Sequence, residues 1–92
     1  MTRAQGVTTV EHEKGLHARP ASVFVQTASK FDADVRVSKG GGDGDADAKS
    51  SIAVISLGVE SGDTIEITAD GEDADEAVER LVALVDDDFE EA

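Results

Sequence analysis

The 92-residue sequence predicts an α+β fold, an open-faced β-sandwich in which a four-stranded antiparallel sheet carries three helices on one face. First, segments that alternate apolar and polar side chains take turns with segments of helical apolar spacing, in the order β-α-β-β-α-β-α. Second, each clear strand has one apolar face only, so helices are expected on one side of the sheet. The length fits a single domain spanning residues 1–92.

Four segments are predicted to be strands, residues 6–12, 34–39, 45–49 and 64–70. The last of them, TIEITAD, has the clearest alternation, with Ile65, Ile67 and Ala69 on one face. The third, DADAK, also alternates, but Asp and Ala are poor strand formers. We therefore expect it to be a weak edge strand, joined to the second strand by the turn GGGDG. The first, GVTTVEH, alternates poorly.

Three segments are predicted to be helices, residues 18–31, 49–58 and 73–87. The first has an apolar stripe with helical spacing, formed by Ala21, Phe24, Val25 and Ala28. Pro20 suits the first turn of this helix, where the missing N–H costs nothing. His17 is therefore expected at the N-cap or just before it.

The other two helices have recognisable ends. Ser50 can cap the short apolar helix at residues 49–58, and Gly58 is expected just after its last turn. Asp73 and Glu76 have the spacing of a capping box at the start of the last helix. Its apolar stripe consists of Ala74, Ala77, Val78, Leu81, Val82 and Val85.

The composition excludes several classes of protein. There is no cysteine, so disulfide frameworks and thiolate metal sites are excluded. The chain has 21 acidic and 8 basic residues, a net charge of −13, which disfavours binding to nucleic acids and anionic membranes. No apolar run approaches the roughly 20 residues that span a bilayer, and the N-terminal residues lack a signal-peptide core. We expect a cytoplasmic protein without membrane insertion.

The acidic excess has three explanations: disorder, a basic partner, or a cytoplasm at molar salt. The apolar periodicities argue against disorder. At molar salt the Debye length falls to about 3 Å, so a densely acidic surface no longer repels itself strongly. The acids are spread over the whole chain rather than gathered in one block, which favours the salty cytoplasm.

The stretch KGLHARPAS (residues 14–22) carries the chemistry. The start of a helix offers free N–H groups, here those of Ala18 and Arg19, and a partial positive charge that suits an anion. The guanidinium of Arg19 adds donors that match phosphate oxygens. His17 at this position can act as a nucleophile and hold a phosphoryl group on a ring nitrogen. The alternative is that His17 is only a cap and Arg19 a solvated surface residue.

The stretch GLHARPA (residues 15–21) followed by KSSIAVISLG (residues 49–58) resembles HPr, the histidine phosphocarrier family of the sugar phosphotransferase system. The likeness covers nearly the whole chain and includes VQTASKFDADV after the first motif. It implies the HPr-like open-faced sandwich and a stoichiometric carrier rather than an enzyme with its own small substrate. Neither a cofactor nor a metal is implied, and we expect a monomer.

The resemblance also implies roles for individual residues. His17 would accept a phosphoryl group on Nδ1 from Enzyme I, which takes it from phosphoenolpyruvate, and would pass it to an EIIA-type protein or domain. Arg19 would help to bind and release the group. Ile52 and Ile55 would contact partners. Ser50 matches the serine that a regulatory kinase phosphorylates in some bacteria of the family. Ser51 stands where the family usually has a large apolar residue.

The alternatives are a regulatory binding module and a cation-binding protein. In a regulatory binding module, the partner would be a kinase, a permease component or a transcriptional regulator, and phosphorylation would only switch affinity. In a cation-binding protein, Asp43, Asp45 and Asp47 would imitate a calcium loop, but Ala48 and Val54 stand where such a loop needs Gly and Glu. His12 is expected to be an ordinary surface histidine.

Overall fold

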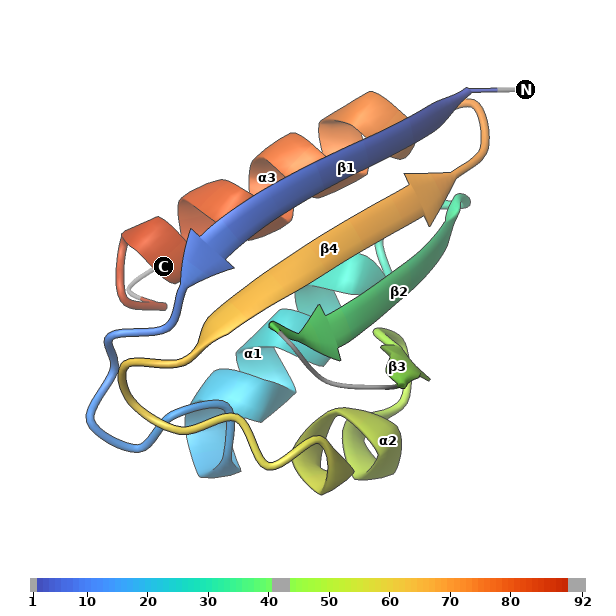
Figure 1. Ribbon diagram of the computed structural model, residues 1–92. Helices are drawn as coiled ribbons and strands as arrows, with labels where there is room; N and C mark the ends of the chain where they lie inside the picture. The colour runs from blue at the N-terminus through green and yellow to red at the C-terminus, as the bar shows by residue number, and fades with distance from the viewer. Residues whose placement is uncertain (1, 41–43, 90–92) are drawn as a thin grey trace.

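The computed structural model describes residues 2–40 and 44–89 and has the predicted fold class (Figure 1). Its elements are β1 (Arg3–Thr9), α1 (Ala18–Ala28), β2 (Asp34–Lys39), β3 (Asp45–Asp47), α2 (Ser51–Ser56), β4 (Thr64–Asp70) and α3 (Ala74–Asp86). The order β-α-β-β-α-β-α and the open-faced arrangement are therefore confirmed.

The sheet is antiparallel throughout, with the strand order β1-β4-β2-β3. Val35 lies opposite Ala69 and Val37 opposite Ile67, so the predicted apolar faces of β2 and β4 coincide. All of these side chains are buried, whereas the alternate residues face away from the helices. The three helices lie on one side of the sheet, with α3 against β1 and β4 (Figure 1).

The helices bury the stripes that their spacing predicts, except that Val25 and Val82 are only half-buried. The buried residues of α1 are Pro20, Ala21, Phe24, Thr27 and Ala28, and those of α3 are Ala74, Ala77, Val78, Leu81, Leu84 and Val85. Burial of one large apolar side chain stabilises the fold by about 1.5–3 kcal/mol, so this layer fixes the helices on the sheet.

The first strand runs from Arg3 to Thr9 rather than over the predicted residues 6–12. Its inward side chains are small because α3 packs closely: a Cβ on Gly6 would lie 2.8 Å from Val78 Cγ1. The apolar Val7 points outward and is 58% exposed, while the inward Thr8 donates to Asp86 Oδ1 at 2.5 Å. An apolar face was therefore absent from the sequence of this strand.

The third strand and the second helix are shorter than predicted. The ladder of β3 ends at Asp47, whose carbonyl and carboxylate accept the N–H groups of Ser50 and Lys49 in a turn. Ser50 then caps α2, as predicted, by accepting the Ala53 N–H at 3.3 Å. Gly58 follows α2 with a φ of 70°, also as predicted. Within the turn GGGDG, residues 41–43 lie outside the described residues, and so does Asp43.

The predicted capping box at the start of α3 is wrong. Asp73 occupies the N-cap position, but its side chain makes no capping hydrogen bond. Its carboxylate instead accepts the N–H groups of Asp32 and Ala33, at 2.9 and 2.8 Å, in the loop that enters β2. These bonds, that from Asp32 first, lower the pKa of Asp73. The carboxylate accepts two N–H groups of this loop and none of its own helix. Because these donors lie about 40 residues away in the chain, no local sequence spacing predicts the contact.

Candidate functional site: a helix N-terminus with an uncapped histidine

His17 is the N-cap residue of α1, as the position of Pro20 predicts. Its backbone is extended, with φ −128° and ψ 168°, and its half-buried side chain makes no capping hydrogen bond. The interpretation of His17 as a cap is therefore not supported. Because the first N–H groups of a helix have no partner within it, those of Ala18 and Arg19 stay without a side-chain cap. Ala18 and Arg19 are exposed, so this helix start lies at the surface beside the half-buried His17.

Ala18, the first helical residue, has a φ of 52°. For a residue with a Cβ, this left-handed conformation costs roughly 1–2 kcal/mol. Such strain persists only where the surrounding structure fixes the backbone. Ala18 is exposed, but the chain is anchored two residues before it and two residues after it, where Leu16 and Pro20 are buried.

The loop before His17 rests on the turn before β4. The Leu16 N–H donates to the Val59 carbonyl at 3.0 Å, and the buried Leu16 side chain enters the core. Gly15 has a φ of 64°, and a Cβ at this residue would lie 2.4 Å from the Val59 oxygen. Only glycine satisfies both constraints without a shift of the backbone. The Gly-Leu pair of the motif therefore sets where His17 emerges.

Arg19 lies exposed in the first turn of α1, two residues after His17. Within residues 2–40 and 44–89 it makes no ion pair, although the chain has 21 acidic residues. Its guanidinium is thus not committed to a carboxylate and can bind phosphate oxygens. Arg19 and the open helix end thus offer donors that suit an anion, next to His17 in the chain.

The short helix α2 contacts α1 and lies beside it (Figure 1). Ile52 and Ile55 are 78% and 42% exposed, whereas Val54 is fully buried. The sequence reasoning that so short an apolar helix must leave some apolar side chains outside is therefore confirmed for these two. Ser50, half-buried at the start of α2, uses its hydroxyl as a cap.

The aspartates of the imitated calcium loop have protein partners where they are described. Asp45 accepts from the Arg36 guanidinium at 3.0 Å, which lowers the pKa of Asp45, and Asp47 accepts the Lys49 N–H. In the described part of the chain, no three His, Cys, Asp or Glu side chains are grouped so as to hold a metal ion. His12 lies half-buried in the loop after β1, where Nδ1 accepts the Lys14 N–H.

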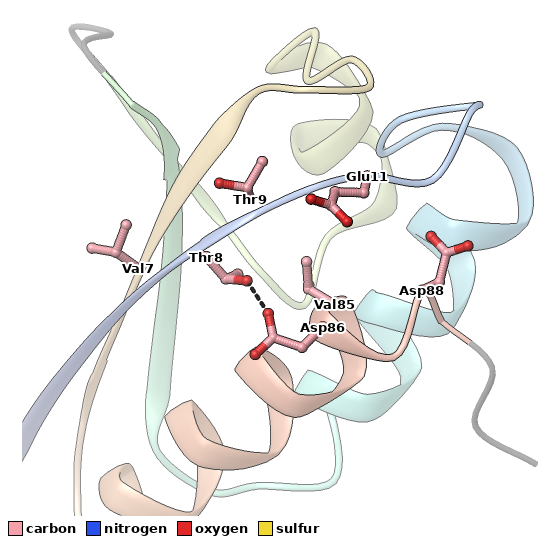
Figure 2. A pocket seen from close by; sticks show the side chains of 7 residues that line it. All are labelled: Val7, Thr8, Thr9, Glu11, Val85, Asp86 and Asp88. Carbon is pink, nitrogen blue, oxygen red and sulfur yellow. Dashed lines mark hydrogen bonds between the residues drawn. The ribbon is translucent and has the colours of Figure 1, made fainter.

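A surface hollow of about 620 Å³ lies between the end of β1 and the end of α3 (Figure 2). It is lined by Val7, Thr8, Thr9, Glu11, Val85, Asp86 and Asp88. None of the residues predicted to carry the chemistry is among them. Its acidic side chains would repel a phosphoryl group, so this hollow does not belong to the candidate site.

Lys39 and Asp63 were missed by the sequence reasoning. Lys39 Nζ lies 3.4 Å from Asp63 Oδ2 and donates to the Gly58 carbonyl at the same distance. The Asp63 carboxylate also accepts the Glu60 N–H at 2.9 Å. These bonds, the Glu60 N–H first, lower the pKa of Asp63. The pair joins the end of β2 to the turn before β4, and no local motif marks such a contact.

Among the described helices, none is long and apolar enough to cross a membrane.

Comparison with known proteins supports the resemblance found in the motifs. Residues 4–87 match the family model described as the PTS HPr component phosphorylation site. The chain is 48% identical over 73 residues to the phosphocarrier protein HPr of Haloferax volcanii, which covers 79% of this chain and 82% of that protein.

Solved structures agree with this match. The crystal structure of HPr-C-His from Thermoanaerobacter tengcongensis is similar with a TM-score of 0.90 and 39% identity, over 97% of this chain and 98% of that one. The structure described as an HPr dimer from the same organism has a TM-score of 0.75 and 45% identity, over 84% and 86% of the two chains.

Proposed function

The chain belongs to the HPr family, the phosphocarrier component of the phosphotransferase system, and from this premise we propose that His17 is its phosphoryl acceptor. The donor is Enzyme I, charged by phosphoenolpyruvate, and the recipient is an EIIA-type protein or domain. The observation that carries the proposal is the uncapped helix start: His17 occupies the N-cap position without using it.

The transfer is a displacement at phosphorus. A ring nitrogen of His17, proposed to be Nδ1, forms a P–N bond while the bond between phosphorus and the donor breaks. The phosphoryl oxygens then face the N–H groups of Ala18 and Arg19 and the Arg19 guanidinium. In the second transfer a nucleophile of the recipient forms a bond to phosphorus while the P–N bond breaks, and the nitrogen regains its lone pair. Each chain holds one group until it passes that group on, so the protein is a stoichiometric carrier and not an enzyme with its own small substrate.

Partners are proposed to bind over the exposed part of α2. Ile52 and Ile55 offer apolar surface on a helix that contacts α1, whose first turn follows His17. Because the carrier must release one partner before it meets the next, each interface should be small and transient. We place the carrier in the cytoplasm as a monomer whose residues 1–92 form one domain. The dimer described for a relative makes the oligomeric state worth measuring.

Ser50 has a second proposed role. Its hydroxyl caps α2 and is half-buried, two residues before the exposed Ile52. A phosphate at this place would put negative charge at a helix start and beside the surface proposed to meet partners. Phosphorylation by a regulatory kinase would therefore reduce the acceptance of phosphate from Enzyme I.

The test is to incubate the protein with phosphoenolpyruvate and a series of purified Enzyme I preparations and to measure its intact mass. One added phosphate is expected, labile in acid and stable in base, as a phosphoramidate is. His17→Ala should remove it and His12→Ala, the matched histidine control, should keep it. Acid-stable label, or label that survives His17→Ala, contradicts the proposal.

A chase separates the carrier from the regulatory module. The phosphorylated protein is freed of Enzyme I and mixed with EIIA-type domains. A carrier should lose its phosphate to one of them in stoichiometric amounts. Label that stays on His17 with every recipient, while phosphorylation changes the affinity for another protein, would favour the regulatory module.

A further inference from the structure

The loop that leads to His17 makes three backbone hydrogen bonds to one neighbouring segment, residues 58–63, here called the platform turn. Two backbone bonds join its end to Val10: the Val10 N–H donates to the Asp63 carbonyl at 2.9 Å, and the Gly62 N–H donates to the Val10 carbonyl at 2.7 Å. A third joins Leu16 to the Val59 carbonyl, one residue before His17. Both ends of the loop are thus hydrogen-bonded to the platform turn, so a displacement of the turn would displace the loop.

Two side chains, those of Asp63 and Lys39, stabilise the platform turn itself. The Asp63 carboxylate accepts the Glu60 N–H and so closes the turn on itself. The Lys39 ammonium group, at the end of β2, donates to the Gly58 carbonyl and lies 3.4 Å from the Asp63 carboxylate. Lys39 therefore contacts the first and the last residue of the turn at once.

We infer that Lys39 and Asp63 are positioning residues for phosphoryl transfer, because they hold the platform turn on which the His17 loop is anchored. Neither touches the phosphoryl group in this account. Their effect passes through the bond from Leu16 to Val59 and the contact of Gly15 with Val59 to the strained backbone of Ala18. The inference rests on the proposed function, since it concerns the same site.

The Lys39–Asp63 pair is expected to contribute little to the free energy of folding. Side chains of Lys39 and Asp63 are 41% and 32% exposed, and ion pairs this exposed contribute little to folding. The same strand provides a matched pair, Arg36 and Asp45, at 3.0 Å and with exposures of 41% and 53%. This second pair links β2 to β3, and within the described part of the chain no hydrogen bond or ion pair joins it to the platform turn. A general loss of ion pairing would affect both pairs alike, whereas a positioning role belongs to the first.

The kinetic experiment compares Lys39→Met, Lys39→Arg and the control Arg36→Met in phosphoryl acceptance from the Enzyme I that labels His17. Because small displacements of reacting groups are costly, Lys39→Met should lower kcat about tenfold. KM should change little, since Ile52 and Ile55 stay in place. Lys39→Arg keeps the charge and should restore most of the rate, and Arg36→Met should react like the wild type. A wild-type kcat for Lys39→Met, or an equal loss in Arg36→Met, overturns the inference.

A second readout needs no partner protein. In hydrogen exchange, the N–H groups of Leu16 and Val10 should exchange faster in Lys39→Met than in the wild type. The N–H of Ala48, bonded to the Val35 carbonyl away from the platform turn, is the internal reference and should not change. If Lys39→Met does not fold, Asp63→Asn takes its place, with the same expectation. Unchanged exchange at Leu16 and Val10 contradicts the inference. This readout does not depend on any Enzyme I, so a failure of the inference can be told apart from a failure of the proposed function.

Discussion

The helices α1 and α2 differ sharply from α3 in charge. Residues 18–28 and 51–56 contain one charged side chain, Arg19, and no acid. The 13 residues of α3 contain four acids and one arginine. In a chain with a net charge of −13, acids are thus absent from the two helices next to His17. The difference teaches that the acids of the helices belong to α3, whereas α1 and the exposed apolar surface of α2 carry none.

The largest expected effect comes from breaking this separation. Ile52→Asp places an acid on the uncharged, exposed side of α2. Loss of an apolar contact at the centre of an interface costs at least about 1–2 kcal/mol, so acceptance from Enzyme I should slow by roughly tenfold or more. Ile55→Asp should act in the same direction. The rate is measured by intact mass against time.

The control for this change lies on the other region. Ala83 is exposed on α3, where Ala83→Asp adds the same charge among existing acids. Transfer should then proceed as in the wild type. Equal slowing in both variants would mean that net charge, and not the α2 surface, governs the encounter.

Salt should act on the acidic region first. Thirteen excess negative charges repel one another in dilute buffer, and molar KCl screens them. Salt also weakens ion pairs, but exposed pairs such as Arg36–Asp45 and Lys39–Asp63 contribute little to stability. Repulsion therefore outweighs pairing, and the melting temperature should rise from dilute buffer to molar KCl. A flat or falling melting temperature would remove the explanation of the acids by a salty cytoplasm.

Some acids stabilise the fold through hydrogen bonds, and the pH dependence of stability distinguishes them from acids that only repel one another. The folded pKa of Asp73 is lowered by two N–H bonds, so its stabilisation is present above the unfolded pKa of about 3.9 and is lost as pH falls through the lower folded value. In molar KCl, Asp73→Ala should melt below the wild type at pH 7, and the difference should shrink towards pH 2. Glu72→Ala, an exposed neighbour, should show no such convergence.

The smallest expected effect concerns the cap of α2. Ser50→Ala removes the acceptor of the Ala53 N–H and should cost about 0.5–2 kcal/mol in the free energy of unfolding, measured with urea. Ser51→Ala, the exposed residue that follows, should cost less, since it is not the cap. If the two variants were equally stable, Ser50 would contribute nothing as a cap.

The sequence predicted what depends on local pattern. Alternation placed Ile65 and Ile67 inward, and Pro20 placed His17 at the helix start; both are confirmed. The bounds of the first strand were predicted wrongly because α3 packs closely on it and requires glycine at the inward position 6. Glycine has no apolar side chain, so the alternation that marks a strand is missing there. Partners far apart in the chain left no signal at all. Asp73 binds a loop 40 residues away, and Lys39 at the end of β2 pairs with Asp63 just before the neighbouring β4, so only the folded chain brings them together.

The most direct measurement of the central claim is an NMR experiment on the phosphorylated protein, with ¹⁵N in both histidine rings. The chain has only His17 and His12, so the two rings can be assigned by one substitution, His12→Ala. On phosphorylation, Nδ1 of His17 should become coupled to phosphorus, while both ring nitrogens of His12 keep their signals. A phosphorus coupling at His12, or a phosphorylated protein in which neither ring changes, would contradict the account.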